Sequence, residues 1–168
     1  MVKKFSISSG TLKRIKERAS KLPLLNNSIR LGVSEETYRK GILVAYIGEE
    51  VVKKVLDGDI KDTYDYDIIY NGIKVDVKTK ERTVSPEPHF NCTVADFNTK
   101  QSCDEYAFVN VLKNLSCAWY LGKIDKKTFF EEATFYKKGE LDPDSPPWKK
   151  FYFQADCHNL PMRKLICS

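Results

Sequence analysis

The dipeptide Asn71-Gly72 is the feature that most constrains the fold, because it separates two stretches rich in β-branched and aromatic residues. Asn-Gly favours a two-residue type I′ turn, in which both central residues need a positive φ. The sequence therefore predicts a β-hairpin with strands over residues 64–70 and 73–80. In this hairpin, facing residues have numbers that add up to 143, so Asp67 faces Asp76.

Side chains alternate between the two faces of a strand, so one face of this hairpin is nearly all apolar and the other is charged. The charged face carries Asp65, Asp67, Lys74, Asp76 and Lys78. Facing carboxylates repel each other, and a divalent cation held by oxygen ligands would explain the pair. The alternative is a solvated face on which Asp65 and Lys78 form an ordinary cross-strand ion pair. Repulsion alone predicts that Asp76→Asn raises the melting temperature of the metal-free protein.

The pattern Asp-x-Lys occurs three times, at Asp59/Lys61, Asp76/Lys78 and Asp125/Lys127. Only the middle copy lies in an alternating strand with an acid across the turn. We therefore expect Lys78 to orient an attacking water or to contact a phosphate oxygen.

A helix is predicted before the hairpin, from the N-cap Ser34 to Leu56. Glu49 shares its stripe with Ala45 and Val52, which should pack on the sheet. A buried glutamate is costly without a cation or a hydrogen-bond partner, so Glu49 is a third candidate acid. Glu50, by contrast, has lysines one turn away on a solvated face.

A helix with Gly48-Glu49, a strand with Asp67, a tight turn and the sequence Asp76-Val77-Lys78 resembles the PD-(D/E)XK nuclease superfamily, including its small phage-encoded members. The resemblance implies an α/β fold with a restriction-endonuclease-like core, a central mixed β-sheet flanked by helices. It also implies a catalytic set of Glu49, Asp67, Asp76 and Lys78, with Mg²⁺ bound by the three acids and Mn²⁺ able to substitute. Two residues depart from the family pattern, since Tyr66 replaces its proline and the second acid is Asp instead of the frequent Glu.

Basic charge is concentrated near the N-terminus. The net charge is +5, yet residues 1–34 hold eight Lys and Arg against one Glu, while the other 134 residues hold 20 basic and 22 acidic groups. A basic helix is predicted from Ser9 to Leu22. Contacts to nucleic-acid phosphates are expected from Lys13, Arg14, Lys16, Arg18, Lys80 and Arg82. The alternative for the helix is a solvated charged face.

The rest of the chain alternates between predicted strands at 106–112, 118–122 and 151–155 and a helix at 128–138 that ends at Gly139. These elements predict one mixed α/β domain. We divide the chain into a basic helical extension over residues 1–33, with linker-like residues after Lys21, and a nuclease-like domain over residues 34–168.

The five cysteines, Cys92, Cys103, Cys117, Cys157 and Cys167, exclude a fully paired disulfide framework and predict reduced, buried thiols. Their spacing from His89 and His158 is too scattered to favour zinc. No apolar run reaches the ~18 residues of a membrane span, and no signal-peptide core is present. The sequence therefore predicts no membrane partner and a cytoplasmic location, and the resemblance to the nuclease superfamily implies a bacterial or phage-infected cell.

These observations together predict an Mg²⁺-dependent DNA endonuclease that hydrolyses phosphodiester bonds. Two alternatives remain open, a catalytically idle nucleic-acid-binding protein on the same fold and a ribonuclease with the same site. A homodimer would supply two sites for cutting both strands. Gln101 is a candidate assisting residue or an ordinary polar loop residue, and His89 is a candidate base or a structural residue beside Phe90.

Overall fold

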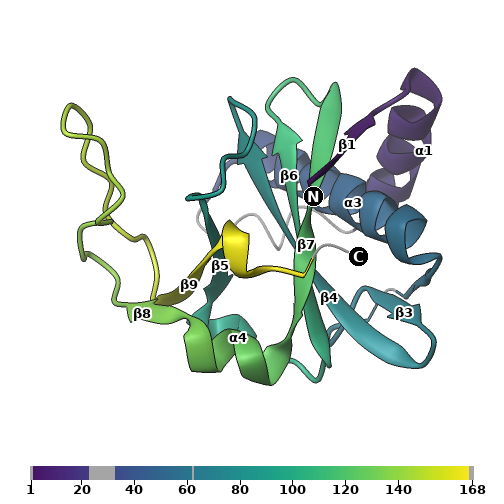
Figure 1. Ribbon diagram of the computed structural model, residues 1–168. Coiled ribbons are helices and arrows are strands. Elements are labelled where there is room, and N and C mark those ends of the chain that lie inside the picture. Colours follow the sequence, from purple (N-terminus) through teal and green to yellow (C-terminus); the bar gives the residue numbers. More distant parts are fainter. Residues whose placement is uncertain (1, 23–32, 62, 167–168) are drawn as a thin grey trace.

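A six-stranded mixed sheet forms the centre of the computed structural model, which describes residues 2–22, 33–61 and 63–166 (Figure 1). The strands, in their order across this sheet, are β1 (Lys3–Ser6), β7 (Cys117–Asp125), β6 (Glu105–Leu112), β4 (Ile73–Arg82), β3 (Ile68–Tyr70) and β2 (Asp59–Ile60). β4 and β6 run parallel, and the other neighbouring pairs are antiparallel. A smaller antiparallel sheet contains β5 (Asn91–Ala95), β9 (Cys157–Pro161) and β8 (Thr134–Tyr136).

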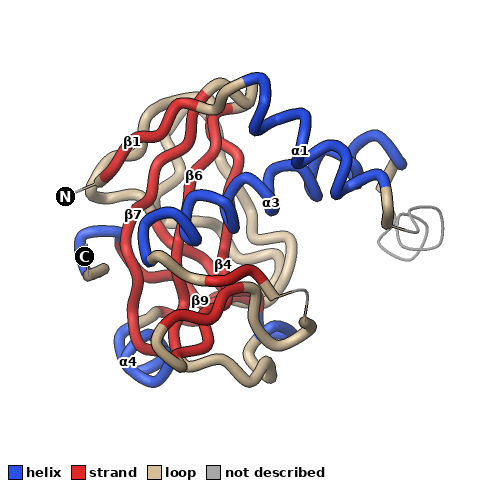
Figure 2. The backbone as a smooth tube through the Cα atoms, turned by 90° about the vertical axis from the view of Figure 1, so that its right-hand side faces the viewer, coloured by secondary structure: helices blue, strands red, loops and turns tan. Residues whose placement is uncertain are grey.

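The helices cover the two faces of the main sheet, which gives a mixed α/β fold. α1 (Ser9–Ser20) and α3 (Glu35–Leu56) lie on one side, as Figures 1 and 2 show, and α4 (Lys126–Glu132) packs with the smaller sheet on the other. Two short 3₁₀ turns are η1 (Asp96–Asn98) and η2 (Met162–Lys164). No helix in the described part of the chain is long and apolar enough to cross a membrane.

Alternate residues of the central strands belong to two separate apolar cores, one on each face of the main sheet. Val75 and Val109 pack toward Ile47 and Val52 of α3. On the opposite face, Phe108 belongs to the core that also holds residues of α4 and β9. The central strands are therefore covered on both faces, and charged groups on them need partners.

The hairpin has the predicted turn and register. Ile68 faces Val75 and Tyr70 faces Ile73, while φ is 47° at Asn71 and 80° at Gly72. The first strand is shorter than predicted, because residues before Asp67 form a turn. The Asp65 carboxylate there accepts a hydrogen bond from the backbone N–H of Ser102 at 3.0 Å, so the alternative pairing of Asp65 with Lys78 is wrong.

The long helix before the hairpin also has the predicted boundaries. The Ser34 hydroxyl accepts a hydrogen bond from the N–H of Thr37 at 3.1 Å, and the helix ends at Asp57, whose φ is 52°. Gly48 brings α3 against β4, since a Cβ at this position would lie 1.9 Å from Oγ1 of Thr79. The helix that carries Glu49 is thereby held close to the strand that carries Asp76.

Three local predictions were wrong or incomplete. The helix predicted at 128–138 runs over Lys126–Glu132, and the aromatic, β-branched residues that follow form β8 instead. Residues 151–155 make an isolated bridge between Leu141 and Tyr152 instead of a regular strand. β1, β2, β5 and β9 were not predicted, because short strands have little periodicity of their own.

The N-terminal segment is attached to the main sheet. β1 pairs with β7, and Ile15 of α1 is buried against the α3 core. The division at residue 33 stays a prediction, and the linker-like residues 23–32 lie outside the described residues. Cys92, Cys103, Cys117 and Cys157 are free and buried, and Cys167 also lies outside the described part.

Residues 137–156, which join β8 to β9, form a projecting segment that we call the arm (Figure 1). Its two sides are held together by backbone hydrogen bonds, such as Gly139 N–H to Phe153 O at 2.8 Å and Asp142 N–H to Phe151 O at 2.8 Å. The arm exposes several large apolar side chains, with Trp148 85% exposed. This exposure is typical of a surface that contacts another molecule.

Candidate functional site

The candidate site lies where β3 ends its pairing with β4. The backbone N–H of Asp67 still donates to Val75 O at 2.9 Å, and two residues further along β4 the partner is the Asp67 side chain. Oδ2 of Asp67 accepts a hydrogen bond from the N–H of Val77 at 2.7 Å. The Asp67 carboxylate is therefore fixed against the open edge of β4, beside Asp76.

Asp76 and Lys78 form an ion pair on one face of β4. Asp76 is only 4% exposed, and its Oδ2 lies 2.6 Å from Nζ of Lys78. The same ammonium donates to Oε1 of Gln101 at 3.2 Å, and Gln101 is itself held by the carbonyl of Tyr64 at 2.7 Å. Lys78 therefore contacts the carboxylate of Asp76 and the side-chain amide of Gln101. From the sequence alone, Gln101 was open as an assisting residue or an ordinary loop residue.

Glu49 is 7% exposed, and its Oε2 lies 2.6 Å from Nη1 of Arg18 in α1. The Arg18 guanidinium also stacks on the ring of Tyr46, with 3.6 Å between its Cζ and the ring centroid. The buried position predicted for Glu49 is confirmed. Its partner Arg18 was expected at the nucleic-acid surface, and in this arrangement it compensates a buried acid instead.

Burial and two neighbouring carboxylates raise the pKa of Asp67 to about 8. Lost hydration is the main cause, followed by the charge of Asp76 and then that of Glu49. A hydrogen bond to Asp76 also favours the protonated form of Asp67, while the Val77 N–H acts in the opposite direction. Asp67 is thus close to both of the other predicted acids, and their charges disfavour ionisation of its carboxyl group.

These residues fit a magnesium ion held mainly by two carboxylates. In the described residues, no three His, Cys, Asp or Glu side chains are grouped closely enough to ligate one metal ion together. Mg²⁺ commonly takes one or two carboxylates and keeps several waters, which suits Asp67 and Asp76. A divalent charge there would reverse the repulsion that keeps Asp67 protonated.

The residues expected to contact nucleic acid fall into two groups. Lys13, Arg14 and Lys16 are exposed on α1. Lys80 ends the predicted strand and Arg82 lies beyond it, but both belong to β4, because this strand continues to Arg82. They share a strand face with Asp76 and Lys78, since their numbers differ by multiples of two.

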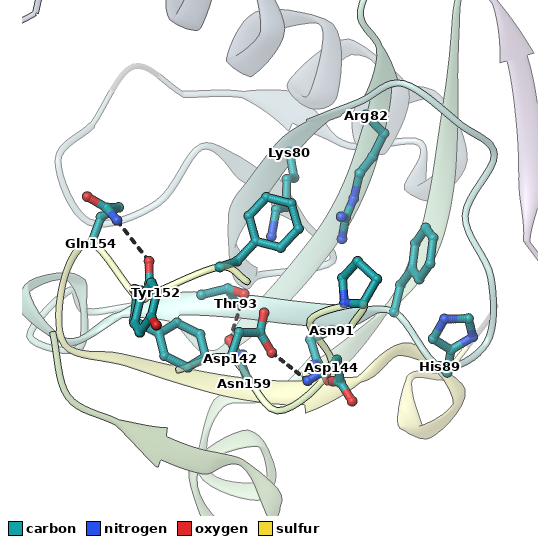
Figure 3. Close-up of a pocket in the computed structure, with 14 residues that line it drawn as sticks. Lys80, Arg82, His89, Asn91, Thr93, Asp142, Asp144, Tyr152, Gln154 and Asn159 are labelled. Atoms are coloured by element: carbon teal, nitrogen blue, oxygen red, sulfur yellow. Dashed lines mark hydrogen bonds between the residues drawn. The ribbon is translucent and has the colours of Figure 1, made fainter. Parts of the chain in front are cut away.

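Lys80 and Arg82 line a cavity of about 470 Å³ between β4, the smaller sheet and the arm (Figure 3). His89 stands at its margin, where Nδ1 lies 3.5 Å from a carboxylate oxygen of Glu87 and the ring packs edge-on against Phe90. Of the residues that line this cavity, the sequence signalled Lys80, Arg82 and His89. Its arm residues lie in a proline-containing loop, and only the fold brings them to β4.

No protein-family model matches the chain, and no curated protein matches it either. Functional conclusions therefore depend on the chemistry of the site.

Proposed function

We propose that the chain is a metal-dependent DNA endonuclease of the PD-(D/E)XK type. The observation that carries the proposal is the buried Asp67 carboxyl group at the edge of β4, which Asp76 and Glu49 both influence, with Lys78 paired to Asp76. The arrangement of α3 against a hairpin, followed by a strand parallel to β4, supports a restriction-endonuclease-like core.

Asp67 and Asp76 would hold Mg²⁺, which when bound supplies a charge that polarises the scissile phosphate and stabilises the oxygens of the transition state. Lys78 would place an attacking water, because its ammonium is already fixed between Asp76 and Gln101. Glu49 would assist through its carboxylate, which Arg18 now neutralises.

The test is nicking of supercoiled plasmid DNA in Mg²⁺ or Mn²⁺. The parent protein should cut, while Asp76→Ala and Lys78→Ala should each lose on the order of 100-fold or more in rate. The chain supplies a matched control, since Asp59 and Lys61 have the same Asp-x-Lys spacing outside the site. Asp59→Ala and Lys61→Ala should cut at the parental rate.

Metal binding gives an independent measurement. Titration calorimetry should show Mn²⁺ affinity that Asp67→Asn abolishes and Asp59→Asn leaves unchanged. Absence of nicking with either metal, together with parental DNA binding by Asp76→Ala, would refute the enzyme proposal.

The rival function is an idle nucleic-acid-binding protein, and the ion pairs Asp76–Lys78 and Arg18–Glu49 favour it, because each acid then has a cation partner without metal. Parental DNA binding without cleavage would select this rival. A parallel assay with RNA separates the ribonuclease, which would cut RNA and leave plasmid intact.

A further inference from the structure

The cavity beside the arm, which we call the arm cavity, is basic on one wall. Lys80 and Arg82 extend into it from β4, as Figure 3 shows. No salt bridge among the described residues involves Lys80 or Arg82. The guanidinium of Arg82 rests on the ring of Phe90 at 4.7 Å, and its buried Nε has no hydrogen-bond partner in the described part of the chain.

The two cations are incompletely compensated. Lys80 reaches solvent but is surrounded by the cavity walls, and its pKa is lowered first by lost hydration and then by the charge of Arg82. Asp142 acts in the opposite direction, yet its carboxylate also accepts the N–H of Asp144 at 3.0 Å. Asp144 in turn binds the side-chain amide of Asn91. This wall therefore favours an anion that touches both cations.

The opposite wall is aromatic and polar. Phe151 and Tyr152 of the arm line the cavity and are 47% and 52% exposed. Asn159 of β9 also lines the cavity, and its side-chain oxygen Oδ1 accepts a hydrogen bond from the Thr93 hydroxyl at 2.7 Å. Aromatic faces with amide and carboxylate groups at their edge are the features that bind an unstacked base. The volume lies within the roughly 300–1,000 Å³ of small-ligand sites.

Strand β4 runs from the carboxylate site to this cavity. At about 3.3 Å per strand residue, Lys80 lies about 13 Å along β4 from Asp76, which is roughly four stacked nucleotides and fewer in an extended strand. A second cavity of about 450 Å³ is lined by Lys78, Lys80 and Asn91. It therefore borders both the catalytic lysine and the arm cavity.

We propose that the arm cavity binds one unpaired nucleotide of a DNA strand, with its phosphate at Lys80 and Arg82 and its base against Tyr152 and Phe151. The assignment of the strand as DNA rests on the proposed function. A base held in a duplex is stacked and paired, so the protein binds single-stranded or locally opened DNA more tightly than intact duplex.

The test measures binding without cleavage, by fluorescence anisotropy of a labelled single-stranded 12-mer in EDTA. A second 12-mer has the same backbone but abasic residues throughout. The wild type should bind the normal strand about 10-fold more tightly than the abasic strand, the scale of one stacked base. Tyr152→Ala should remove this difference, and Tyr152→Phe should keep it because the ring remains.

The double variant K80Q/R82Q should weaken binding of both strands and reduce the salt dependence by about 0.7 for each phosphate that the variant no longer binds. Lys127→Gln removes one lysine from α4, outside the cavity, and should change neither quantity. Melting temperatures of all variants establish that each is folded. The comparison of the two strands on the wild type needs no variant at all.

Equal wild-type affinity for the two strands overturns the proposal, as does an undiminished difference in Tyr152→Ala, an absence of binding, or tighter binding of duplex. Plasmid nicking separates the two hypotheses. Metal-dependent cutting with equal affinities means that the cavity assignment fails while the nuclease stands. Base-dependent binding that disappears in Tyr152→Ala, without cutting in Mg²⁺ or Mn²⁺, means that the cavity assignment stands while the nuclease proposal fails.

Discussion

The two ends of one strand face of β4 carry opposite charge imbalances. At the Asp76 end, two acids, Asp76 and Glu49, each have a cation partner, and a third acid, Asp67, has a pKa that is raised by burial and by its acidic neighbours. At the Arg82 end, two cations share a cavity and no salt bridge of the described residues includes them. Paired charges mainly stabilise the fold, whereas the surplus at each end marks where a ligand of opposite charge would bind.

The largest effect should come from breaking the paired acid. Asp76→Asn leaves the Lys78 ammonium, whose side chain is 16% exposed, without its carboxylate, and we expect a loss of about 3 kcal/mol, the lower end of the cost of removing one partner from a buried ion pair. This reverses the stabilisation predicted from repulsion between the facing acids alone. Urea denaturation in EDTA measures the loss. A melting temperature above that of the parent would show that repulsion outweighs the ion pair.

Substitution of Asp67, in contrast, should stabilise the metal-free protein. Asp67→Asn keeps an oxygen for the Val77 N–H and removes the charge, so the metal-free protein should gain about 2 kcal/mol at pH 8. Because folding raises this pKa from 3.8 to about 8, the stability due to Asp67 is complete below pH 4 and is lost as the pH rises toward 8.

Denaturation at pH 5 and pH 8 in EDTA should therefore show a gap between variant and parent that widens with pH. Groups elsewhere titrate equally in both proteins, so the gap isolates Asp67. A constant gap would mean that Asp67 is already ionised in the fold.

A glycine sets how closely α3 approaches the middle of β4, between the two ends. Gly48→Ala would place a Cβ 1.9 Å from Oγ1 of Thr79, and overpacking of this kind costs about 1.5 kcal/mol. The matched control is Gly41→Ala on the same helix, where no atom lies within 4 Å and the gain of helix propensity should stabilise. Thermal melts should move in opposite directions, and a parallel shift would contradict the close packing.

The smallest effect belongs to the unpaired cations. Lys80→Gln removes the repulsion with Arg82, and the free protein should gain less than about 1 kcal/mol because Lys80 reaches solvent. The same change should weaken binding of DNA. Loss of stability in this variant, measured by urea denaturation, would indicate that Lys80 has a structural partner.

The sequence predicted best where local chemistry decides the structure. Asn71-Gly72 determined the turn and hence the register, and Ser34 and Asp57 marked the ends of α3, because turns and caps depend on neighbouring residues. The acids were predicted from register and helix periodicity. Arg18 beside Glu49 and Gln101 beside Lys78 could not be, since both contacts join segments more than 20 residues apart through tertiary packing.

The pairing of β1 with β7 has a consequence for how the chain is made. Lys3 lies opposite Tyr120, so more than a hundred further residues must be synthesised after β1 before its partner strand exists. Contacts this distant in sequence slow folding, and an unpaired strand is prone to associate with other chains. Lys3 and Lys4 place positive charge on that waiting strand, which discourages such association during synthesis.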